Sequence, residues 1–566
     1  MPKSVGVIGA GPGGLAAAAI LRREGFDVEV FELRDKPGGR NSKIHLGEFK
    51  FDTGPTFFLM PGILEGIFQR CGKSLSEYVK LHKIDPLYKL DFGPQGSMWP
   101  SSDPKKTSQE LAKFSKRDGE NFWAFRKRQI QKFNAVFPAL KNSADKIADL
   151  IRLENFPALP YLDLRSVYSE LADFFEDERS RLAFTFQAKY LGMSPFECPS
   201  LFSILPHIEH DQGVWHPEGG CGALSEGMAK LFQDLGGAIH YNCPIESVET
   251  QNGAITHILT SSGEKRKFDH YVMNVDFSWG MKNLFSEGSR QKFKNEKLEK
   301  LKYSCSTFML YLGLDRKLDW PHHAIYFSKN YRKNLRELCE TFEISGDPSF
   351  YVHNPSNLDP SLAPDGKSAL YVLVPAPQLH PSRTWQWAEM KEKYRKLILD
   401  LMTERCGQDI RPFIVQEKII TPQDWQDEYQ IFRGATFSLA HSPDQLMQNR
   451  PRNQNEDFRN LFIVGGGTHP GSGLPTIYQS GILAADKILA IEKNKNSFGF
   501  KLPNPEQFQS VFKDFQSYGT QWASSRLPLV QGFAQESAKF LEKGKVEKLL
   551  SKIRTKKNGK EIDLNN

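Results

Sequence analysis

Short apolar runs, glycine-rich turns and amphipathic stretches alternate along the chain. Residues 5–8 form a continuous apolar run, which is typical of a strand buried on both faces of a parallel sheet. An alanine-rich helix is expected at residues 15–23 and a second strand at residues 28–31. The pattern therefore predicts a strand–helix–strand unit at the N-terminal end of the sequence.

Similar elements recur in the middle of the sequence and near its end. After a turn at residues 215–220, a helix is expected, and several short strands follow it. Another buried strand and a long helix are expected later in the chain. The expected ranges are helix 223–235, strands 238–241, 245–250, 255–260, 307–314, 369–374 and 461–464, and a last helix that ends near residue 491. The intervening residues 86–205 are charged and helical in pattern, with few strand signals.

This order predicts an α/β fold whose Rossmann-type cofactor domain is assembled from discontinuous segments. An α+β substrate domain is inserted between those segments, and a helical, basic tail follows. The expected boundaries are 1–85, 211–275 and 455–495 for the cofactor domain, 86–210 and 276–454 for the substrate domain, and 496–566 for the tail.

Charge and cysteine content narrow the functional class. The net charge is only +7 over 566 residues, which argues against a nucleic-acid-binding protein. The seven cysteines contain no C-x-x-C pair, so we expect no zinc knuckle and a reducing cytoplasm. We expect neither a signal peptide nor a transmembrane run. Contact with a membrane is expected from its surface only.

A glycine motif lies in the first turn. Gly9 permits a tight turn, Gly11 lets the backbone approach a pyrophosphate, and Gly14 lets the helix pack closely on the sheet. The amides at the start of the helix attract phosphates. Glu32 follows the second strand, where a carboxylate binds ribose hydroxyls. The motif predicts a dinucleotide cofactor but does not separate NAD from FAD.

The next residues point to a family. Gly38, Gly39 and Arg40 follow the acidic residue closely, and the segment FDTGP follows at residues 51–55. Both segments resemble the flavin amine-oxidase and carotenoid-desaturase superfamily, which has a glutathione-reductase-like fold. The resemblance implies that FAD is the cofactor and that Gly38, Gly39 and Arg40 lie beside it.

Two later segments resemble bacterial-type phytoene desaturases, which are carotenoid oxidoreductases. They are GVWHPEGGCGAL at residues 213–224 and VGGGTHPGSGLP at residues 464–475. The resemblance covers about residues 3–490. It implies further FAD contacts at Val248, Gly466, Gly467, Leu474 and Pro475. The sequence TIYQ at residues 476–479 departs from the family pattern, and this leaves the particular carotenoid and reaction step open.

The implied reaction needs few side chains. A hydrocarbon polyene has no heteroatom for a nucleophile or a metal to bind, and a flavin itself supplies hydride chemistry. The implied partners are an apolar polyene, a membrane surface, and a quinone or oxygen as electron acceptor, with no nucleic acid. Arg165 is a candidate for stabilising charge and His469 is a candidate base. A surface arginine and a residue that organises the backbone turn are the competing interpretations.

Other activities use the same motifs. A carotenoid isomerase, a carotenoid oxidase, a retinol-saturase-type reductase and a flavin amine oxidase remain alternatives. Prenyl-binding proteins of the Rab escort and GDP-dissociation-inhibitor type are a non-enzyme alternative, although their phosphate loop is degraded and this one is intact.

Two remaining patterns bear on metals and membranes. His207 and His210 share a helix face but have no third ligand, so we expect no metal site there. In the tail, Phe508, Val511, Phe512, Phe515 and Tyr518 form one apolar helical stripe. A second stripe, Val546, Leu549, Leu550 and Ile553, is accompanied by lysines. A basic amphipathic helix is typical of membrane-surface binding, and a helix packed on its own protein is the alternative.

Overall fold

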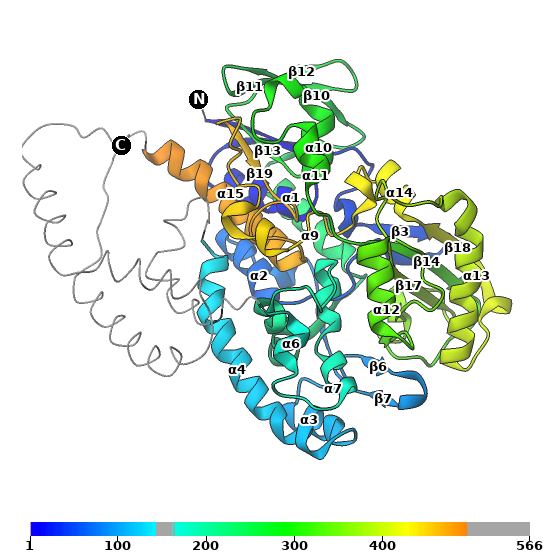
Figure 1. Cartoon of the computed structure of the whole chain (residues 1–566). Coiled ribbons are helices and arrows are strands. Elements are labelled where there is room, and N and C mark those ends of the chain that lie inside the picture. Colours follow the sequence, from blue (N-terminus) through cyan, green and yellow to red (C-terminus); the bar gives the residue numbers. More distant parts are fainter. Residues whose placement is uncertain (1, 143–160, 162–164, 495–566) are drawn as a thin grey trace, which may run out of the picture. The chain divides into compact units, whose positions relative to one another are not determined.

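We describe residues 2–142, 161 and 165–494 of the computed structural model (Figure 1). The two amphipathic stripes expected in the tail lie outside these residues. Sequence elements that are distant from each other meet in two main sheets, and the fold belongs to the α/β class, as predicted.

The first sheet has five strands, which are all parallel. Their order is β19 (Leu461–Ile463), β13 (His270–Met273), β1 (Ser4–Ile8), β2 (Asp27–Phe31) and β9 (Ala238–His240). The strands come from the beginning, middle and end of the chain. The exact domain boundaries given above remain a prediction.

Both faces of this sheet are buried, which explains its apolar strands. Val5, Val7 and Val30 pack into a core formed with helices α1 (Pro12–Arg23), α9 (Gly222–Asp234) and α15 (Leu474–Asn494). Ile8 and Phe31 belong to the core on the opposite face. That core includes the three-stranded sheet of β10 (Ile245–Gln251), β11 (Ala254–Thr260) and β12 (Lys265–Arg266), together with α10 (Phe277–Leu284).

The second main sheet has seven strands and is largely antiparallel. Its order is β18 (Ile414–Ile420), β14 (Ser306–Leu314), β17 (Ser368–Ala376), β16 (Phe350–His353), β15 (His323–Tyr326), β6 (Lys89–Asp91) and β7 (Ser97–Met98). Successive side chains of β14 point to opposite faces of the sheet. Leu310 and Leu312 pack against α13 (Trp387–Cys406). Met309 and Tyr311 face the hairpin of β3 (Lys43–Leu46) and β4 (Phe49–Asp52).

A helical layer adjoins this sheet. It contains α4 (Lys116–Leu140), α6 (Val167–Leu171), α7 (Glu178–Ala183) and α8 (Ile204–Gln212). Lys132 of α4 and Glu170 of α6 form a buried ion pair with a shortest N–O distance of 2.6 Å. Lys132 also donates to Ser203 Oγ at 2.8 Å. Because a buried charge is costly without partners, this pair fixes α4 against α6 and α8.

The remaining elements are short. They are α2 (Pro61–Arg70), α3 (Pro104–Ala112), α11 (Asn295–Lys300), α12 (Tyr331–Arg336), α14 (Pro422–Asp427), β5 (Leu81–Ile84) and β8 (Val214–Pro217). Strand β8 occupies part of the segment expected to be a turn, and it pairs with β5. Within residues 86–205, strands β6 and β7 were not anticipated. Across the described ranges, none of the helices has the length and apolar character needed to span a bilayer.

Candidate active site

The site forms where the parallel strands end. Gly9 follows β1, Glu32 follows β2, Asn274 follows β13 and Gly465 lies just beyond β19. The carboxyl ends of parallel strands share one edge of a sheet, which is where α/β proteins bind their ligands. A cavity of about 470 Å³ lies at this edge, and all four residues line it.

The first turn has no space for side chains. Gly9 has a φ of 97°, in the left-handed region. A Cβ on Gly11 would lie 2.4 Å from Asn274 Nδ2, and one on Gly14 would lie 2.5 Å from the Gly9 carbonyl oxygen. No side chain caps the start of α1. The uncapped amides and the close backbone packing fit a pyrophosphate group.

Glu32 closes this turn through the backbone. Its carboxylate accepts hydrogen bonds from the Ala10 amide at 2.7 Å and from the Arg34 amide at 3.0 Å. Burial raises the pKa of Glu32, and these two amides partly oppose that effect. Glu32 therefore holds the shape of the turn as well as lining the cavity.

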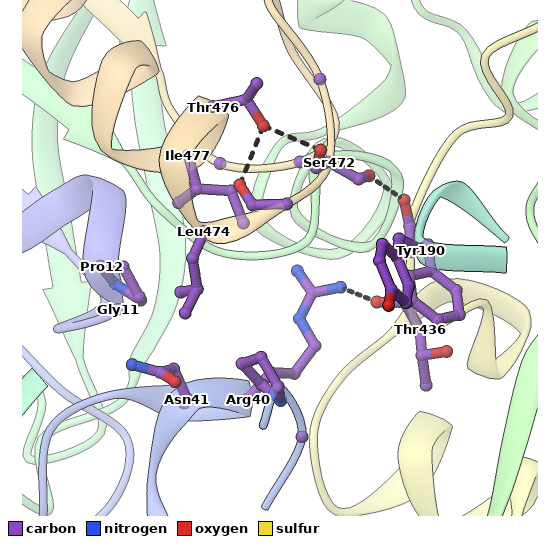
Figure 2. A pocket seen from close by; sticks show the side chains of 18 of the residues that line it. Gly11, Pro12, Arg40, Asn41, Tyr190, Thr436, Ser472, Leu474, Thr476 and Ile477 are labelled. Atoms are coloured by element: carbon purple, nitrogen blue, oxygen red, sulfur yellow. Dashed lines mark hydrogen bonds between the residues drawn. The ribbon is translucent and has the colours of Figure 1, made fainter. Parts of the chain in front are cut away.

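Arg40 brings a positive charge to the middle of the cavity. Gly38 has a φ of 108°, and a Cβ there would lie 2.4 Å from the Asn41 carbonyl oxygen. In Figure 2, the Arg40 side chain extends toward Thr436, and its Nη1 donates to the Thr436 carbonyl oxygen at 2.6 Å. Burial lowers the pKa of Arg40, and the nearby Asp276 raises it in part. The guanidinium remains charged at neutral pH.

A second glycine turn, at residues 465–473, also lines the cavity. It precedes α15, whose first residues Leu474, Pro475, Thr476 and Ile477 line the cavity (Figure 2). A Cβ on Gly481 would lie 2.4 Å from the Gly13 carbonyl oxygen, so α15 and α1 approach each other closely.

Arg450 supports this turn by hydrogen bonds to its backbone carbonyl groups. Its guanidinium donates to the Gly466 carbonyl oxygen at 2.6 Å and to the Thr468 carbonyl oxygen at 3.0 Å, and the side chain is buried. Burial lowers its pKa to about 9. Sequence analysis missed Arg450 and also Asn274, which donates to the Gly9 carbonyl oxygen at 3.2 Å. Neither residue has a local sequence signal, because the strand that places Asn274, β13, was not predicted.

The rest of the cavity is largely apolar and aromatic. Its walls include Phe57, Phe133, Phe137, Phe186, Tyr190, Phe202, Leu205, Ile208, Ile325 and Leu373. Phe57 lies in the loop after β4, and the other residues come from the helical layer with its 3₁₀ turns and from the inner face of the seven-stranded sheet. The cavity therefore joins a polar end, built for phosphates, to an arm suited to a hydrocarbon.

Burial shifts the pKa values of two titratable groups in and behind this part of the cavity. Lys189 lines the cavity, and burial lowers its pKa to about 8. Behind Tyr190, the buried Glu209 accepts hydrogen bonds from Tyr88 and Gln187, each at 2.9 Å. Burial raises the pKa of Glu209 to about 7. Burial therefore favours the neutral form of this carboxyl.

Most of the predicted cofactor residues meet at the cavity. The lining includes Gly9, Gly11, Glu32, Gly38, Gly39, Arg40, Gly466, Gly467, Leu474 and Pro475. Gly14 lies behind the first turn, against Gly9. Val248 lies in β10 within an apolar core and is absent from the lining, in which Ile245 of the same strand appears instead.

The two catalytic candidates lie outside the lining. Arg165 pairs with Asp173 at 2.7 Å, and 44% of its side chain is exposed. His469 is buried, and its Nε2 lies 3.0 Å from the Asn142 carbonyl oxygen, whereas its neighbours Pro470 and Gly471 do line the cavity. Neither position supports direct contact with the reacting atoms.

The geometry is that of a flavoprotein. The family model for flavin containing amine oxidoreductases matches residues 12–489, so the chain belongs to this family. It is an FAD-dependent oxidoreductase, and the glycine turns, Glu32 and Arg40 fit that cofactor. An oxidoreductase from Methanosarcina mazei has a similar fold, with a TM-score of 0.58, 16% identity, and coverage of 86% of this chain and 99% of that one. Wild-type putrescine oxidase bound to putrescine is also similar in fold, with a TM-score of 0.56, 15% identity, and coverage of 87% and 99%.

Closer sequence relatives have specific names. The 4,4'-diapophytoene desaturase (4,4'-diapolycopene-forming) of a Methylomonas species is 41% identical over 488 residues, which is 86% of this chain and 95% of that protein. The all-trans-zeta-carotene desaturase of Myxococcus xanthus is 38% identical over 489 residues, covering 85% of this chain and 92% of that protein.

The first prediction concerns the phosphate turn. Gly11→Val should abolish flavin binding, because a side chain there fills the space expected for the pyrophosphate and also meets Asn274. The visible absorbance of the purified variant, relative to its protein content, measures the loss. Gly66→Val is the control, since a Cβ on Gly66 meets nothing within 4 Å. A folded Gly11→Val variant with full flavin absorbance would show that the phosphates bind elsewhere.

Proposed function

We propose that this protein desaturates a phytoene-like polyene in carotenoid biosynthesis. The observation that carries the proposal is that aromatic and aliphatic residues line the same cavity as the cofactor turns. The relatives named above support the same substrate class, since both are desaturases of carotenoid-type polyenes.

The cavity is poorly suited to an amine. A cationic amine needs a free carboxylate or an equivalent partner when it is buried. Within the described part of the chain, the lining carboxylates are Glu32 and Asp276. Glu32 is bonded to two backbone amides, and Asp276 accepts from the Trp279 amide at 3.1 Å. A hydrocarbon needs no such partner, so the lining favours the polyene over amine oxidation.

The chain's own residues chiefly bind and orient. When bound, FAD supplies the hydride acceptor for removal of hydrogen from an allylic carbon. The glycine turns and Arg40 hold the cofactor's polar parts, while the aromatic walls align the extended hydrocarbon and exclude water. Loss of hydride leaves a cation that is stabilised by conjugation and is strongly acidic. We therefore expect a weak acceptor to suffice for the remaining proton, and we assign no general base.

We further propose that the polyene is taken from a membrane surface and that a quinone or oxygen reoxidises the cofactor. The apolar substrate partitions into lipid, so the enzyme must collect it there. The lysine-rich pattern of residues 541–566 supports contact with an anionic surface.

The proposed activity is tested with the FAD-loaded protein. Liposomes containing phytoene or its thirty-carbon analogue, with a quinone as acceptor, should yield products with longer conjugation, detected by absorption and chromatography.

His469→Ala and Arg165→Ala should retain measurable turnover per bound FAD, because both residues lie outside the cavity lining. A general acid–base residue contributes about 10²–10⁴-fold, and a smaller loss is expected here.

Two outcomes would contradict this account. No desaturated product from either polyene, with flavin bound and reoxidation working, would overturn the substrate class. A loss of about three decades or more for His469→Ala, at normal flavin content, would show that His469 takes part in the proton step.

The membrane proposal has a separate test. Deleting residues 541–566 should weaken binding to anionic liposomes in sedimentation assays, because several lysines are removed, and flavin content should be unchanged. Binding of the full chain should fall as salt is raised. Binding that is unaffected by the deletion and by salt would leave no role for this segment in docking.

A further inference from the structure

A cluster of histidines lies outside the cofactor cavity. His216 lies in β8, His322 directly precedes β15, and His353 ends β16. One ring nitrogen from each of them lies within 4.8 Å of the others. His216 and His353 are buried, whereas His322 is partly accessible. The three residues are brought together by the pairing of β15 with β16 and by the approach of β8.

The distances suit metal coordination. The Nε2 atoms of His322 and His353 are 3.2 Å apart. Two imidazole nitrogens bound to a tetrahedral zinc ion at about 2.0–2.1 Å would be about 3.4 Å apart. The ring nitrogen of His216 lies within 4.8 Å of these two, so a closer approach of its ring would complete a set of three ligands.

His216 provides an independent observation. Its Nε2 lies 3.0 Å from Asp359 Oδ2, and its Nδ1 is buried with no hydrogen-bond partner. Asp359 also accepts from the Gly219 amide at 2.6 Å, which fixes the carboxylate. A carboxylate on one ring nitrogen, with the other nitrogen left open, is the usual arrangement of a metal-binding histidine. A hydrogen bond between His322 and His353 would satisfy one nitrogen of each ring, but it would leave His216 Nδ1 and His322 Nδ1 without a partner.

We propose that His216, His322 and His353 bind a divalent transition-metal ion, with zinc as the best match to three imidazoles. Asp359 lies outside the coordination sphere and orients His216. A water molecule completes the tetrahedron on the accessible side, beside His322.

This site stands directly behind the cavity wall. His323 Nδ1 lies 2.6 Å from Tyr351 Oη, which is 2.8 Å from Thr56 Oγ1. Both Tyr351 and Thr56 line the cavity. The bound ion would join β8 to the seven-stranded sheet, and it would thereby hold this wall in place. Its role is structural, since no ligand of the ion lines the cavity.

The test uses the full chain with FAD bound. The protein is dialysed against a chelator, incubated with zinc sulfate, freed of unbound metal, and analysed for zinc per chain by mass spectrometry. Wild type should hold close to one equivalent, and its thermal midpoint should rise with zinc concentration. His322→Gln and His353→Gln should lose the metal and the midpoint shift while keeping flavin. Asp359→Asn should bind zinc about 10–100-fold more weakly.

His257→Gln is the matched control, because His257 lies in β11, away from the cluster, and is paired with Glu249. It should behave as wild type. His322 is partly accessible, so its variant should fold even if His353→Gln does not. Wild type without bound zinc after this treatment, or His322→Gln with an undiminished zinc content, would overturn the proposal. X-ray absorption of the zinc form should show three imidazole ligands, and a different ligand set would also overturn it.

Discussion

The close meeting of backbone at the carboxyl edge of the five-stranded sheet is the constraint on which the rest of the site depends. The turn after β1, the start of α1 and the start of α15 share this edge, and a Cβ on Gly11, Gly14 or Gly481 would collide with its neighbours. Because no side chain fits, backbone amides are left facing the cavity. The strands that supply this edge come from the beginning, middle and end of the sequence, so the site exists only when the whole sheet is assembled.

A second consequence is the separation of polarity within one cavity. The sheet edge contributes amides and the Arg40 charge, whereas the helical layer and the inner face of β14 and β17 contribute hydrocarbon. The buried Lys132–Glu170 pair fixes the helical layer, and the buried Arg450 supports the second glycine turn. One cavity thereby offers a polar part to a charged cofactor and an apolar part to an uncharged substrate.

The sequence was most informative where one local pattern has one physical meaning. The run at residues 5–8 and the glycines after it predicted β1 and the cofactor turn, and α1 begins earlier than expected because Pro12 is tolerated in the first turn of a helix. Strands β15 and β16 were not predicted, because they are defined by pairing with each other and with β6 and β17. Arg450, Asn274 and the three clustered histidines carry no local signature. Arg165 shows the converse, because its segment resembles a family pattern while its side chain pairs with Asp173 at the surface.

The central claim is that the polyene in the apolar arm gives its hydrogen directly to the bound cofactor. Anaerobic mixing of the FAD-loaded protein with phytoene-like polyene in liposomes, with no added acceptor, tests this in a single turnover. The account predicts that the flavin absorbance bleaches as the polyene spectrum shifts to longer wavelength, with one new double bond formed per flavin reduced. Product formation without flavin bleaching, or no bleaching by a polyene that binds, would contradict it.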